Sequence, residues 1–152
     1  MPQIPTKYFG AVEYQETDVV QFPSGLPAFE QETQFLVMEP LAQAPMVFLQ
    51  SLSNPSLCFL AMPILTIDPE YKLRMTAEDL QALQLPTDRQ PSLGDGIICL
   101  ALIAVAEDGS ISANLLAPVV IRTADRRGVQ AVRVDSTYSH QYLVTGKQEV
   151  CL

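Results

Sequence analysis

The stretch that most constrains this chain is FPSGLPAFE, residues 22–30. Pro23 and Pro27 each fix φ and remove an amide donor, so this stretch cannot continue a helix or a central strand. Gly25 permits a positive φ that its neighbours would resist. These residues predict a rigid, shaped loop.

The loop also carries large apolar side chains at Phe22, Leu26 and Phe29. So short a segment cannot hide all three, so some must pack on the body beneath or meet a partner. Two interpretations stay open at this point. One is a structural corner between strands, and the other is a partner-binding corner that loses little entropy on docking.

The length of 152 residues predicts a single domain over 1–152, which buries roughly 68 to 70% of its unfolded surface. The longest apolar run, residues 97–106, is about half as long as a membrane-spanning helix. The N-terminal residues lack the apolar stretch of a signal peptide. We therefore expect a cytoplasmic protein without membrane contact, and we expect a monomer.

The net charge of −8 is distributed unevenly. Residues 1–90 hold 4 basic and 11 acidic residues, net −7, whereas residues 91–152 hold 5 and 6, net −1. Such a surface repels phosphate backbones, which argues against direct nucleic-acid binding. It suits a basic protein partner, or it serves solubility alone.

The residues offer no metal site and no catalytic group. Cys58, Cys99 and Cys151 are widely spaced and indicate reduced thiols, the first two in the core, and His140 is the one histidine. Ser24 lacks the flanking glycines of a nucleophile elbow. Paired carboxylates occur only where a helix start or a turn explains them, at 78–79 and 107–108.

Short β-branched and aromatic segments alternate with proline and glycine turns, which indicates strands. The expected strands are residues 6–14, 18–22, 34–38, 46–52, 57–62, 97–106, 110–115, 119–123 and 129–134. One helix is expected over 75–85, capped by Thr76 and stopped by Pro86. Asp108 and Gly109 predict a hairpin turn, and Pro118 belongs at a bulge, strand start or edge. The fold class is mainly β, an antiparallel β-barrel-like roll of about ten short strands with one or two short helices.

Four motifs occur in order: FPSGLPAFE at 22–30, LQS at 49–51, NLLAPVVI at 114–121 and R-x-G-x-Q-x-V at 126–132. In this combination the chain resembles the FliW family of flagellar assembly factors, from residue 8 to residue 138. The resemblance implies a β-barrel-like domain without enzymatic activity or cofactor. The sequence departs from the family at Ala28, where glycine is commoner, and near His140.

The resemblance also implies partners. Proteins of this family bind flagellin in the cytoplasm as chaperones, and they antagonise CsrA, the repressor of flagellin translation. The implied partner-binding residues are Phe22, Leu26, Phe29, Glu30 and Asn114, and the implied loop-shaping residues are Pro23, Gly25, Pro27 and Pro118.

An alternative from another class is a small split-barrel protein that binds a flavin or a similar ligand. Its phosphate would need a basic site. The one candidate is a set of arginines around a single hairpin, which equally suits a solvated turn: Arg122, Arg126, Arg127 and Arg133.

Overall fold

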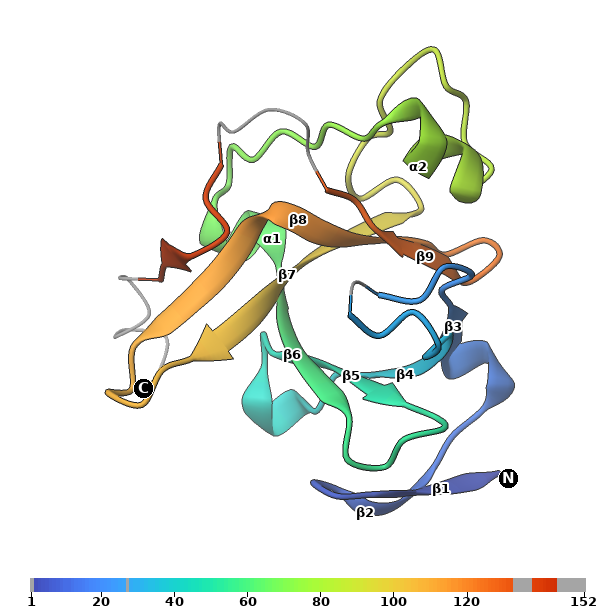
Figure 1. The fold of residues 1–152 in the computed structure, drawn as a ribbon, viewed down its shortest axis with the longest axis vertical. Helices are drawn as coiled ribbons and strands as arrows, with labels where there is room; N and C mark the ends of the chain where they lie inside the picture. Colours follow the sequence, from blue (N-terminus) through green and yellow to red (C-terminus); the bar gives the residue numbers. More distant parts are fainter. Residues whose placement is uncertain (1, 27, 133–137, 145–152) are drawn as a thin grey trace.

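A computed structural model of the chain describes residues 2–26, 28–132 and 138–144, and its strands close into a barrel (Figure 1). The strands are β1 (Gln3–Thr6), β2 (Gly10–Glu13), β3 (Val19–Gln21), β4 (Gln34–Met38), β5 (Val47–Ser51), β6 (Cys58–Pro63), β7 (Ile97–Val105), β8 (Ile111–Arg122), β9 (Arg127–Gln130) and β10 (Tyr142–Leu143). The helices are α1 (Ile64–Ile67) and α2 (Ala77–Ala82), with 3-10 turns η1 (Glu16–Asp18) and η2 (Leu41–Gln43). The predicted β-barrel-like class is confirmed.

Seven strands form the closed wall, in the order β8, β7, β6, β5, β4, β3, β9 and back to β8. All their pairings are antiparallel except that of β3 with β9, which is parallel, with Gln21 opposite Arg127. There the Gln21 amide donates to the carbonyl of Arg126 at 2.8 Å. This one parallel seam departs from the antiparallel pairing expected from the sequence.

The strands β7 and β8 carry apolar side chains on both faces, because much of each face is covered. Ile97 and Cys99 pack outward under α2 and its flanking loops, while Leu100 and Leu102 point into the barrel with Val119. The continuous apolar run of β7 follows from this double burial. A third, smaller core lies under the β1–β2 hairpin.

Two expected strands, 110–115 and 119–123, are one strand, β8. The chain absorbs the expected interruption as a wide bulge, because Leu102 pairs with Asn114 whereas Leu100 pairs with Val119. Pro118 lies in the bulge, as predicted, where its missing amide breaks no ladder bond with β7.

The expected strand 6–14 was also wrong, because it is a hairpin. Gly10 has φ +67°, and the Thr6 hydroxyl donates to the Gly10 carbonyl at 2.8 Å while it accepts from the Phe9 amide at 2.8 Å. These bonds stabilise a turn between β1 and β2.

The expected helix over 75–85 is present but shorter. Thr76 caps it, since its Oγ1 accepts from the Asp79 amide at 3.1 Å. The helix ends before Pro86, because Gln84 has φ +59° and the Leu85 amide turns back to the Leu80 carbonyl at 2.8 Å.

The seam between β3 and β9 depends on a missing side chain at Gly128. A Cβ there would lie 2.6 Å from Cε2 of the Phe22 ring, and Phe22 is fully buried. Glycine is needed at this position for space rather than for backbone conformation.

We predict that Gly128→Ala lowers the free energy of unfolding by about 1–3 kcal/mol, because the added methyl overpacks the Phe22 ring. Urea denaturation measures the change. Phe22→Leu should make part of that room, so the double variant should lose less stability than the sum of the two single variants. Additive losses would mean that the two residues do not press on one another.

Candidate functional site

The loop of residues 22–33 closes one end of the barrel. In Figure 1 the blue segment after β3 folds across the ring of strands. Its entry is tied by the Phe22 amide to the Thr33 carbonyl at 2.7 Å. Leu26 is buried among Phe35 and Leu49, and so anchors the loop in the barrel core.

Two successive tight turns shape this loop. The Gly25 amide donates to the Phe22 carbonyl at 2.7 Å, and the Phe29 amide donates to the Leu26 carbonyl at 2.7 Å. Gly25 has φ +66°, and a Cβ there would lie 2.5 Å from the Glu30 backbone. Both the conformation and the space require glycine; the sequence predicted the positive φ, and the structure adds the close approach of Glu30.

Ala28 adopts φ +72°, a conformation in which glycine costs less than alanine. This is the position at which the sequence departs from the family pattern. The Glu30 carboxylate compensates in part, because its Oε2 accepts a hydrogen bond from the Ala28 amide at 3.1 Å.

A row of four aromatic rings leads from the core to the tip of this loop. Phe22 meets Phe35 edge to face at a centroid distance of 5.5 Å, Phe35 lies 5.9 Å from Phe59, and Phe59 meets Phe29 at 5.5 Å. Phe29, the last ring, is 38% exposed. The row holds an exposed aromatic ring on a rigid support.

The structure separates the predicted site residues. Phe22 and Leu26 are buried, so they offer no surface to a partner, and we correct their expected role to core packing. Asn114 is half buried, and its Oδ1 accepts from the amides of Leu116 (3.1 Å) and Ala117 (2.9 Å), which gives it a role in shaping the β8 bulge.

The remaining predicted residues lie as follows. Phe29 and Glu30 are exposed next to one another on the closing loop. Pro23 is exposed at the first turn, whereas Pro118 is buried in the bulge. Pro27 lies outside the described residues, and His140 is exposed near the end of the described chain.

Sequence reasoning missed the role of Gln50, in the LQS motif. Gln50 is fully buried, and its Nε2 lies 3.1–3.3 Å from the carbonyl oxygens of Ser51, Asn54, Pro55 and Leu57. One amide group thus holds the turn between β5 and β6. A glutamine inside an apolar strand pattern was the available signal, since a buried amide needs partners.

Ser51 belongs to a second network at the same end of the barrel. The hydroxyls of Ser51 and Ser53 donate to Oε1 of Glu32 at 2.6 and 2.7 Å. These two hydrogen bonds lower the pKa of the partly buried Glu32 from its ordinary value of 4.5, and the bond from Ser51 has the larger effect. They connect the closing loop to the β5–β6 turn.

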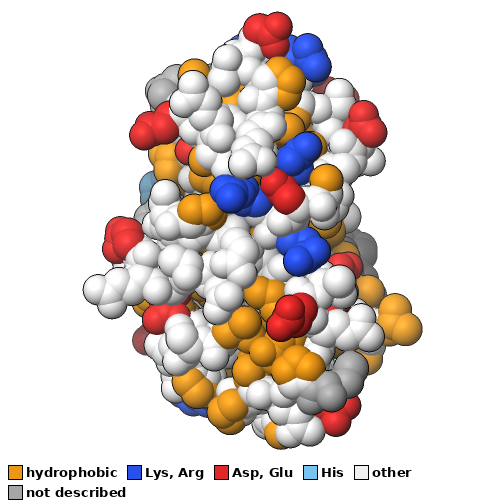
Figure 2. Space-filling model, turned by 90° about the vertical axis from the view of Figure 1, so that its right-hand side faces the viewer, with side chains coloured by type: hydrophobic (Ala, Val, Ile, Leu, Met, Phe, Trp, Pro, Cys, Tyr) orange, Lys and Arg blue, Asp and Glu red, His pale blue; other side chains and the backbone are white. Residues whose placement is uncertain are grey.

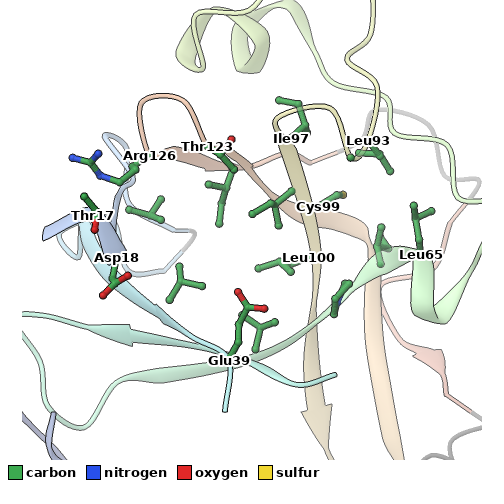
Figure 3. Close-up of a pocket in the computed structure, with 18 residues that line it drawn as sticks. Thr17, Asp18, Glu39, Leu65, Leu93, Ile97, Cys99, Leu100, Thr123 and Arg126 are labelled. Atoms are coloured by element: carbon green, nitrogen blue, oxygen red, sulfur yellow. The ribbon is translucent and has the colours of Figure 1, made fainter. Parts of the chain in front are cut away.

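The opposite end of the barrel is open. A groove of about 500 Å³ lies between the far ends of the strands, and Figure 3 shows lining side chains from β7 and from the segments that flank the strands. Its floor is apolar, and it includes Val20, Leu100 and Ile121. Charged side chains from Asp18, Glu39 and Arg126 stand around it.

Acidic side chains are dispersed on the face drawn in Figure 2, with basic ones near its middle and an apolar area below.

Among the described residues, no group of His, Cys, Asp and Glu could hold a metal ion. Cys58 and Cys99 are free thiols, and burial raises the pKa of Cys99 to about 12. Cys151 lies outside the described residues. No helix in the part of the chain that the structure describes is long and apolar enough to cross a membrane.

Comparison with known proteins decides the family. A profile described as FliW protein matches residues 3–144, most of the chain. The chain belongs to the FliW family. The four sequence motifs were thus a correct indication.

The similarity between this FliW family member and its relatives covers nearly the full length of the chain. It is 31% identical over 141 residues to the flagellar assembly factor FliW of Syntrophomonas wolfei, covering 92% of this chain and 86% of the relative. Identity to the same-named protein of Geobacillus kaustophilus is also 31% over 141 residues, with 92% and 93% covered. A crystal structure of the flagellar assembly factor FliW superposes with a TM-score of 0.80 at 29% identity, covering 94% of this chain and 96% of the other.

We predict that Gly25→Ala destabilises the protein more than Gly109→Ala does. Both glycines have positive φ, so each change costs about 1–2 kcal/mol in backbone strain. Only at Gly25 does the new methyl also meet backbone, whereas nothing lies within 4 Å at Gly109. Urea denaturation of both variants measures the difference, and equal losses would contradict the close approach of Glu30.

A second prediction concerns pH. Because the pKa of Glu32 is lower in the folded state, its hydrogen bonds stabilise the fold above pH 4.5, and this stabilisation is lost as the pH falls through the folded-state pKa. The difference in unfolding free energy between wild type and Glu32→Gln should therefore shrink from neutral pH to below 4.5. Ser53→Ala should reduce that pH dependence, because it removes one of the two donors. A difference that grows on acidification would contradict the assignment.

Proposed function

We propose that this protein is a cytoplasmic flagellar assembly factor that acts by binding other proteins and has no enzymatic activity. The name shared by the relatives and by the superposable crystal structure supports the assembly role. The observation that supports binding is the exposed ring of Phe29. This ring lies on a loop with two hydrogen-bonded turns and packs against Phe59 of β6. A preorganised aromatic ring loses little entropy when a partner covers it.

The partners we propose are flagellin and the translational repressor CsrA. In this scheme the protein is occupied by flagellin while flagellin accumulates, which leaves CsrA free to repress translation. Secretion of flagellin releases the protein, which then antagonises CsrA. Flagellin synthesis is thereby coupled to flagellin export, and the protein works as a single monomeric domain.

The acidic surface supports antagonism of an RNA-binding partner. The net charge of −8 brings negative potential close to any docked protein, which raises the free energy of bringing RNA phosphates to that protein. Direct nucleic-acid binding by this chain is disfavoured by the same charge.

The contact set we propose is narrower than the one expected from the motifs. It consists of Phe29 and Glu30, the two exposed members. Glu30 is within reach of a basic side chain because its carboxylate lies at the surface, where it already accepts from the Ala28 amide. Gly25 contributes indirectly, by allowing the backbone of Glu30 to approach.

The flavin alternative has weaker support. Its ligand would need a basic phosphate site, but the open groove is lined by one arginine, Arg126, and by the two carboxylates of Asp18 and Glu39. Two anionic groups at the mouth disfavour a phosphate. The absorbance spectrum of the purified protein tests this alternative directly.

We predict that Phe29→Ala weakens binding of flagellin or CsrA by about tenfold or more, as truncation of an aromatic anchor does. Isothermal titration calorimetry with each purified protein from the native host measures the change. The thermal midpoint should fall by only a few degrees, because the ring is partly exposed.

Val105→Ala is the matched control, since Val105 is an exposed apolar residue at the end of β7. It should leave both affinities unchanged. If Phe29→Ala binds both partners as tightly as the wild type does, the closing loop is not part of the interface. An absence of binding by the wild type would overturn the proposed function itself.

A further inference from the structure

The open end of the barrel has the properties of a second binding site. Its groove of about 500 Å³ is comparable in size to clefts that bury ligands in other proteins. The floor residues are part of the barrel core, so the groove is a fixed feature of the fold. The proposed contacts of Phe29 and Glu30 do not line it.

The strand register places the two sites at opposite ends. Val37 at the end of β4 and Val47 at the start of β5 line the groove. Phe59, which supports Phe29, lies near the start of β6, whereas Pro63 at the end of β6 lines the groove. A partner at one end therefore leaves the other end accessible.

Apolar side chains at the mouth of the groove are exposed. Leu65, on α1, is 42% exposed, and Ile98, on β7, is 39% exposed. An apolar floor with an exposed apolar rim favours an apolar occupant, because covering it removes apolar surface from water.

The groove also has a charged side. Figure 3 shows Asp18 and Arg126 on one side of the groove and Leu65 on the other. Within the described part of the chain, neither Asp18, Glu39 nor Arg126 takes part in an ion pair. A purely apolar ligand would bring its surface against these charges without pairing them, whereas a segment with apolar and charged faces matches both sides.

We propose that this groove binds an amphipathic segment of a protein partner. Its apolar side chains fill the groove between Leu65 and Ile98, and a basic side chain pairs with Asp18 or Glu39 at the rim. The inference goes beyond the function proposed above, because it adds a contact site that does not use the closing loop.

The test uses a fluorescently labelled synthetic peptide whose leucines recur every three or four residues, with lysines on the opposite face. Fluorescence anisotropy measures its binding to the full chain. We expect saturable binding that a scrambled peptide of equal composition does not show. Equal binding of both peptides, or of neither, overturns the proposal.

Ile98→Glu and Val105→Glu form a matched pair, because both replace an exposed apolar residue on β7 and only Ile98 lines the groove. Ile98→Glu should weaken peptide binding at least tenfold, and Val105→Glu should not. If Ile98→Glu unfolds, as circular dichroism would show, Leu65→Glu on the surface of α1 replaces it with the same expected loss. Equal affinities in the wild type and in the folded groove variant overturn the proposal.

Two further arms identify the occupant. Asp18→Lys combined with Glu39→Lys should weaken binding of the lysine peptide and favour a peptide with glutamates in its place. Analytical ultracentrifugation measures the oligomeric state. A wild type that dimerises while Ile98→Glu stays monomeric would assign the groove to a second copy and overturn the proposal. Phe29→Ala should leave peptide binding unchanged, so failure here and failure of the proposed function give different results.

Discussion

The contact between the Phe22 ring and Gly128 is the interaction on which the rest of this structure depends. It lies at the seam where β3 meets β9, strands separated by about a hundred residues in the chain. The seam closes the sheet, and a closed sheet has no long unpaired edge. Phe22 is also the first residue of the closing loop, so the contact that completes the barrel sets where this loop begins.

From Phe22, aromatic packing and local hydrogen bonds connect the barrel core to the surface of the closing loop. Phe35 and Phe59 support Phe29, and Glu32 joins the loop to the next turn through Ser51. A loop built in this way presents its exposed side chains in one arrangement, which suits recognition of a folded or folding partner. The open end differs, because its apolar floor lacks such a cover.

Local rules predicted much of the fold. The strand at 34–38, the apolar run of β7 and the cap at Thr76 all follow from propensity, burial pattern and turn chemistry. The errors lie where tertiary contacts override those rules. Pro118 ends a strand in most contexts, but here a bulge held by the Asn114 side chain carries β8 through it.

The sequence alone determined that a shaped loop follows β3, because proline and glycine act on their own backbone, and its motifs identified the family. Only the tertiary structure decided that Phe22 and Leu26 face inward while Phe29 faces out, since all three are comparably apolar and burial depends on which strands surround them. The same holds for the open groove. Its lining residues come from many segments of the chain, so no local sequence pattern predicts the groove.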